Sequence, residues 1–216
     1  MNDVIITVRG DHETKCAPEE GVVHLTARCD GPERGPVLER IAAVAAPIRD
    51  ELAAHQASGQ VSEWSGQRTN VWAERPWNTE GKQLPLVHHA SIEIVATFTD
   101  FAALSWWVSA VAEREGVQIS GVTWRLTWAS RRTVEAEVAA HAVQTAVSRA
   151  TAYANALGRA SVTPLEIADV GLLVRPEADP APRMMRTMAP DASPTLDFQP
   201  QDVRVAAGVE ARFAAR

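Results

Sequence analysis

Histidine and carboxylate side chains of the kind that bind metal ions come together at His88, His89 and Glu93. A bound ion needs ligands that converge on it at about 2 Å. Neighbouring residues of a strand point to opposite faces, so His88 and His89 do not easily reach one ion, whereas His89 and Glu93 share a face. We expect a solvated strand face at this position. His12 and His24 could lie diagonally across a hairpin of the first two strands, but two histidines without a third ligand make a weak metal site.

The motifs that position a catalytic nucleophile or a phosphate group are incomplete in this sequence. A hydrolase serine sits on a strained Gly-x-Ser-x-Gly turn, of which residues 64–66 and 119–121 carry only a Ser-Gly fragment. No glycine-rich phosphate loop occurs. The acidic pairs Glu19/Glu20 and Glu135/Glu137 fall on an expected turn and an expected helix, where we expect them to be solvated. The residues therefore predict no catalytic site, no metal and no cofactor, and we expect that the protein is not an enzyme.

The two cysteines, Cys16 and Cys29, match no zinc-binding spacing. If they lie on the two arms of one hairpin that turns at 18–21, the thiols are several residues out of register and too far apart for a disulfide. We expect two reduced thiols, which suits a reducing compartment.

Composition and charge limit the classes of partner. Of 216 residues, 46% are hydrophobic, which is enough for a packed core, and the formal net charge is −6. An acidic chain gains nothing from neutralising phosphates, so we expect no nucleic-acid partner. No run reaches the ~18 apolar residues of a membrane span, and the first ten residues lack the basic and apolar regions of a secretion signal. We therefore expect a cytoplasmic protein without a membrane span.

Alternating and helical patterns predict strand, helix, strand, strand, helix, strand between residues 22 and 128. The strands are expected at 22–30, 60–74, 87–99 and 117–128, after a first strand at 4–16. One helix is expected at 36–57, where Pro47 should kink or split it near Ala46, and a second runs from Asp100 to Gly116. This order is the split βαβ arrangement (βαββαβ), with helices on one face of a mainly antiparallel sheet.

The remaining residues predict a second layer or subdomain. The longest helix is expected at 131–157, with mostly alanine on its buried side, so that its axis lies close to the sheet. Residues 162–175 are expected to be extended, and residues 201–213 to form a last strand. We expect one α+β domain that spans residues 1–216.

Four tryptophans are candidates for an association surface. Trp106 and Trp107 are adjacent on a short helix, so we expect one in the core and the other partly exposed, where it could anchor another subunit. Trp64 and Trp72 are eight residues apart and should share one face of a strand, either in the core or as a docking patch.

Residues 176–200 hold six prolines, which predicts a long loop or arm. This segment is either a mobile loop or an arm that orders on a neighbouring subunit. In the second case Met184, Met185 and Phe198 are candidate contacts. The predicted association residues are therefore Trp64, Trp72, Trp106, Trp107, Met184, Met185 and Phe198.

Several segments together resemble the SIMPL domain, a family that is widespread in bacteria and named for a kinase-associated signalling protein. Residues 5–10 (Ile-Ile-Thr-Val-Arg-Gly) are similar to its first strand, and residues 121–126 (Gly-Val-Thr-Trp-Arg-Leu) to a later strand. The alanine-rich segment 136–158, which ends in Leu-Gly, and the segment 203–213 are similar to its helix and last strand. The turn carries Pro-Glu at 18–19 where the family usually has Pro-Asp, and bacterial relatives are commonly exported.

The resemblance implies an α+β fold with a long helix against a sheet. It also implies large ring-like or channel-like homo-oligomers and a loose association with stress responses and the cell envelope, and it supplies no catalytic residues. We expect a non-enzymatic scaffold whose partner is itself, with another protein as a further candidate. The alternative is a module that binds a small molecule or a peptide in a pocket between the sheet and the 176–200 arm. The assembly state in solution distinguishes the two.

Overall fold

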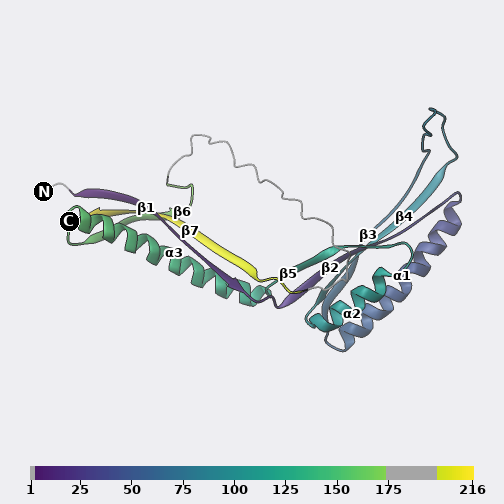
Figure 1. The fold of residues 1–216 in the computed structure, drawn as a ribbon, viewed down its shortest axis with the longest axis horizontal. Coiled ribbons are helices and arrows are strands. Elements are labelled where there is room, and N and C mark those ends of the chain that lie inside the picture. The colour runs from purple at the N-terminus through teal and green to yellow at the C-terminus, as the bar shows by residue number, and fades with distance from the viewer. Residues whose placement is uncertain (1–2, 174–198) are drawn as a thin grey trace. The chain divides into compact units, whose positions relative to one another are not determined.

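The computed structural model describes residues 3–173 and 199–216. Within them the elements follow in the order β1 (Val4–Cys16), β2 (Glu20–Gly31), α1 (Arg34–Ala57), β3 (Val61–Glu74), β4 (Val87–Phe98), α2 (Phe101–Ala112), β5 (Val117–Arg125), α3 (Trp128–Ala156), β6 (Val162–Asp169) and β7 (Val203–Ala215) (Figure 1). The strands form two antiparallel sheets, in the orders β3-β4-β2-β5 and β1-β7-β6. Each sheet belongs to its own compact unit. The predicted α+β class is confirmed.

The four-stranded unit is the predicted βαββαβ core. α1 buries Val37, Ile41, Ala45, Ile48 and Leu52, which recur every three or four residues and so form one stripe. α2 begins at Asp100, whose side chain accepts hydrogen bonds from the backbone N–H groups of Ala102 and Ala103, both at 3.0 Å. These bonds, the one from Ala103 foremost, lower the pKa of Asp100.

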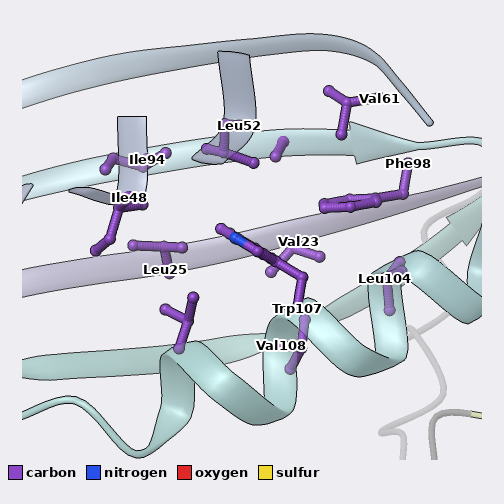
Figure 2. Close-up of a cluster of buried hydrophobic side chains, with 12 residues drawn as sticks. Val23, Leu25, Ile48, Leu52, Val61, Ile94, Phe98, Leu104, Trp107 and Val108 are labelled. Atoms are coloured by element: carbon purple, nitrogen blue, oxygen red, sulfur yellow. The ribbon is translucent and has the colours of Figure 1, made fainter. Parts of the chain in front are cut away.

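The largest hydrophobic cluster lies between this sheet and its two helices. Figure 2 shows its side chains converging from the strands and the helices, with the ring of Phe98 near the indole of Trp107. The two ring centroids are 5.3 Å apart. Burying each large apolar side chain stabilises the fold by roughly 1.5–3 kcal/mol.

The three-stranded unit consists of β1, β7, β6 and the helix α3, which lies along this sheet (Figure 1). The buried face of α3 carries Ala142, Ala146, Ala150 and Ala154, as the sequence predicted. Small side chains let the helix approach β1 so closely that Gly10 has no room for a side chain: a Cβ there would lie 2.5 Å from the backbone nitrogen of Ala146. The clamped alanine face is therefore confirmed.

The hairpin expected between the first two strands does not form. β1 pairs along its whole length with β7, and β2 pairs with β4 and β5. The reason is that the apolar side chains of β1 and β7 alternate in matching register, so that both strands bury one face against α3. No local signal in residues 4–30 distinguishes this distant partner from a neighbouring strand.

Two predicted boundaries also differ in the structure. The expected strand 117–128 ends at Arg125, because Thr127 caps α3 by accepting a hydrogen bond from the backbone N–H of Ser130 at 3.3 Å. α1 runs through Pro47 as one helix, so it is not split near Ala46. Pro47 lies on the exposed side of α1, where water can satisfy the carbonyl group that loses its N–H partner.

No helix in the described part of the chain is both long and apolar enough to cross a membrane.

Candidate association surface

β1 forms one edge of its sheet, and no other strand lies beside its outer side within residues 3–173 and 199–216. Its 13 residues pair with β7 without a bulge and include no proline. Exposed edges in proteins are usually protected by shortness, bulges, proline or charged side chains, and only a bulge, a proline or a covering segment blocks the backbone groups themselves. The other edge strand, β6, has such protection, since it carries Pro164 and a register shift between Pro164 and Glu166. β1 is therefore the edge that is open to another strand.

The exposed face of β1 carries charged side chains at every second residue from Arg9 to Lys15. Arg9 forms an ion pair with Glu210 on β7 at 2.9 Å, and Glu13 forms one with Arg204 at 3.4 Å. Glu210 is buried, and the hydrogen bond from Arg9 is the main cause that lowers its pKa. Arg9 is thus held in place by a neighbouring strand while more than half of its side chain stays exposed.

The side chain of Arg149 on α3 hydrogen-bonds to the backbone of β1. Its Nη1 donates to the carbonyl oxygen of Arg9 at 2.6 Å, and it lies 3.9 Å from the carboxylate of Asp11. This contact places the Arg9 carbonyl on the outer side of β1. Backbone groups alternate between the two sides of a strand, so those of Thr7, Asp11 and Glu13 lie on the same side.

A shallow polar groove of about 490 Å³ lies beside His12 on the α3 side of β1. The ring centroid of His12 is 4.7 Å from that of His141, and Nδ1 of His141 lies 3.2 Å from Oε1 of Gln144. The prediction that His12 would lie diagonal to His24 is wrong, because β1 and β2 are not paired. The groove is completed by small or polar residues at helical spacing, Thr145, Ser148, Arg149 and Ala152.

The adjacent tryptophans of α2 separate as predicted. Trp107 is buried in the core, with 4% of its surface exposed, and its indole N–H donates to Oε2 of Glu51 at 3.1 Å. Trp106 is 80% exposed. Its predicted role as an anchor for another subunit stays a prediction.

Trp64 and Trp72 do not share a face, so that prediction is wrong. Trp64 lies opposite Ala96 and packs on the core, whereas Trp72 lies opposite His89 on the other face of the sheet. The reason is a register shift between Gly66 and Arg68, which inserts one extra residue and turns the rest of β3 over. Trp72 stacks on His89 with ring centroids 5.0 Å apart and is 45% exposed.

Met184, Met185 and Phe198 lie outside the described residues. The pocket expected between the sheet and the 176–200 arm concerns the same segment. Within the described residues, an apolar groove of about 290 Å³ runs between α3 and β6 and is lined by residues that include Val147, Leu165 and Ile167. This volume is at the lower limit of pockets that hold drug-sized molecules.

The polar clusters that the sequence singled out are spread over the molecule. His89 shares its sheet face with Ser91 and Glu93, as predicted, and its Nε2 lies 3.4 Å from Oε1 of Glu74. Among the described residues, no three histidine, cysteine or acidic side chains are grouped so as to hold a metal ion. Cys16 and Cys29 are free thiols on β1 and β2, which pair with different strands, so the register argument for their separation does not apply.

Glu20, which we expected to be solvated, forms an ion pair instead. Oε2 of Glu20 lies 2.6 Å from Nε of Arg125, which also contacts Glu63 at 3.1 Å through Nη2. The side chain of Glu20 is only 13% exposed because Arg125 lies against it. The pKa of Arg125 is raised: burial by itself lowers it, but the hydrogen bonds to Glu20 and Glu63 outweigh that effect. Sequence spacing could not reveal this pair, since its partners are joined only by the pairing of β2 with β5.

The open edge of β1 was also not identified from the sequence. The usable signal was the length of the strand without proline, since the charges from Arg9 to Lys15 indicate only an exposed face. That signal becomes meaningful only once β7 is known to occupy the other side.

A family model matches residues 6–213, nearly the whole chain and both compact units. Its description is "SIMPL: Protein of unknown function (DUF541)". No curated protein matches the chain.

Proposed function

The chain belongs to the SIMPL family, and from this premise we propose that it is a non-enzymatic scaffold that acts by assembling with copies of itself. The observation that carries the proposal is the open edge of β1, a regular 13-residue strand without bulge or proline. An edge of this kind exposes a row of unpaired backbone N–H and C=O groups, which a strand of another chain can satisfy.

The engagement of the polar side chains supports a scaffold over an enzyme. Catalytic groups need side chains that converge on a reacting atom. Here the charged side chains nearest to one another, such as Arg125 with Glu20 and Arg114 with Glu51, are joined in ion pairs at 2.6 and 2.5 Å. These pairs link segments far apart in the chain, and each carboxylate is held by an arginine.

Exposed aromatic surface supports association as well. Trp106 exposes 80% of its surface on α2, and Trp72 exposes 45% on the sheet face. Tryptophan is enriched among the residues that dominate binding energy at interfaces. Trp106 is therefore the residue of choice for a second contact, in addition to the edge of β1.

The test is the molar mass of the purified full chain by size-exclusion chromatography with light scattering, over a concentration series. We expect a mass above that of one chain, 23.4 kDa, that decreases on dilution if the exchange is fast. A single monomeric mass up to about 100 μM would remove the proposal, because an association weaker than that is too weak for a stable assembly.

A further inference from the structure

We propose that two copies of the chain join through β1 in an antiparallel pair centred on Gly10, with Arg9 of each copy opposite Asp11 of the other. This inference rests on the proposed function and goes further, since it names the surface, the register and the symmetry of the contact. The result is one continuous sheet in the order β6-β7-β1-β1-β7-β6, related by a two-fold axis.

The first argument is the charge sequence along β1. Pairing centred on Gly10 puts Arg9 opposite Asp11 twice, once on each side of the axis. Opposite charges at facing positions stabilise a strand pair, and like charges destabilise it. Registers centred on Arg9 or Asp11 place that residue opposite its own copy. A register centred on His12 places Arg9 opposite Lys15.

The second argument is the exposure of the backbone. The Arg9 carbonyl lies on the outer side of β1, where Arg149 donates to it at 2.6 Å. In the proposed register the backbone N–H of Asp11 from the second copy donates to this carbonyl oxygen in place of Arg149. Arg149 then keeps its other contact, the carboxylate of Asp11, 3.9 Å away. In one copy by itself, the side chain of Arg149 therefore donates to the carbonyl oxygen that the second copy would satisfy in the pair.

The third argument is the room beside α3. α3 lies over β1 and β7, and at Gly10 it comes so close to β1 that a Cβ would have no room. Neighbouring strands lie about 4.8 Å apart, so the two-fold axis lies about half that distance outside β1. Because each α3 helix lies over β1 and β7, the axis places the two helices about 10 Å from each other. This is the normal distance between packed helices. The residues that then face the second helix, His141, Thr145, Ser148 and Ala152, recur every three or four positions and line the groove of about 490 Å³.

The first experiment reverses the charges. Asp11→Arg makes both facing positions positive, and Arg9→Glu makes both negative, so each variant alone should bind itself at least about tenfold more weakly than the wild type. An equimolar mixture restores both opposite-charge pairs and should associate as tightly as the wild type. Circular dichroism melts report whether each variant is folded. Glu135→Gln, on the exposed part of α3, is the matched charge control and should associate normally.

A second experiment leaves Arg9 and its pair with Glu210 intact. In the proposed register Thr7 of one copy faces Glu13 of the other, and both side chains are exposed. With Cys16→Ser and Cys29→Ser as background, a mixture of the Thr7→Cys and Glu13→Cys chains should form a disulfide-linked heterodimer on mild oxidation. Either chain alone should give at most a trace of homodimer.

The outcomes separate the inference from the proposed function. A monomeric wild type contradicts both. A wild type that assembles, with charge variants that assemble equally well and no preference for the mixed crosslink, overturns the β1 contact and leaves self-assembly standing. Loss in the single variants, recovery in the mixture and the mixed crosslink establish the register.

Discussion

Two adjacent tryptophans of α2 have opposite environments, which makes them a matched pair. Trp107 fills the core between α1, α2 and the sheet, and its indole N–H is satisfied by Glu51. Trp106 projects from the other side of the same helix and is 80% exposed. Chemistry and helix position are nearly identical, so any difference between the two residues comes from burial.

Truncation of these two side chains should therefore have unequal effects on stability. Trp107→Ala removes a buried ring and leaves a cavity, which should lower the free energy of unfolding by about 3–5 kcal/mol. Trp106→Ala should change it by less than about 0.5 kcal/mol. Urea denaturation followed by circular dichroism measures both. Equal effects would show that the assignment of core and surface on α2 is wrong. If Trp106→Ala leaves the stability unchanged, the same variant can be used to test the association predicted for the Trp106 ring.

The stability of the three-stranded unit should depend on pH through the carboxyl group of Glu210. Its pKa is lowered first by the hydrogen bond from Arg9, and also by bonds from the backbone of Gly171 and Leu173, against an opposing effect of burial. A carboxyl with a lower pKa in the folded state stabilises that state above its unfolded pKa, and this contribution is lost as the pH falls through the folded value.

Glu210→Gln should therefore melt at a lower temperature than the wild type at neutral pH. The gap should narrow below about pH 4.3, where an unfolded glutamate becomes protonated. Thermal melts from neutral pH to acid measure the gap, and Glu135→Gln, which removes only a surface pair with Arg131, should show little change at any pH. A gap that stays constant into acid would contradict the role of Arg9.

At the scale of elements, β1 and α3 make a close contact in the three-stranded unit. Gly10 lies against the backbone of Ala142 and Ala146. A Cβ at this position would clash with backbone atoms of both residues. The stripe of alanines on α3 and the glycine on β1 are thus two halves of one contact. Glycine is unfavourable in a strand, so the presence of Gly10 is explained by the approach of α3 and not by β1 itself.

Gly10→Ala should force β1 and α3 apart and destabilise the protein by about 1–3 kcal/mol. The control is Gly66→Ala on β3, where a Cβ would meet no atom within 4 Å, and which should stay within about 0.5 kcal/mol of the wild type. Urea denaturation measures the two variants side by side. A Gly10→Ala protein as stable as the control would mean that the helix and strand are not clamped at this point.

At the scale of the whole molecule, the chain consists of two compact units, each with its own antiparallel sheet and its own hydrophobic clusters. A two-fold contact through β1 uses one unit and closes on itself, so it yields a dimer and no more. A larger assembly needs a second surface on the same chain. Trp106, Trp77 and Trp72 belong to the other unit and are exposed aromatic residues that could supply it.

Much of the fold could be predicted from the sequence because its signals are local. The stripe of α1, the cap at Asp100 and the alanine face of α3 depend only on residues a few positions apart, and each is present in the structure. The family resemblance depended on segments of the same kind, and the match over residues 6–213 confirmed it.

The sequence by itself therefore determined which segments are helices and strands, which faces of α1 and α3 are apolar, and the family. Only the tertiary structure decided that β1 pairs with β7, that one extra residue near Gly66 turns Trp72 away from Trp64, and that Arg125 binds Glu20. The physical reason is that strand partners and registers depend on contacts between residues far apart in the chain. A local pattern is equally compatible with many of them, and the choice is made only when all the apolar faces are buried together.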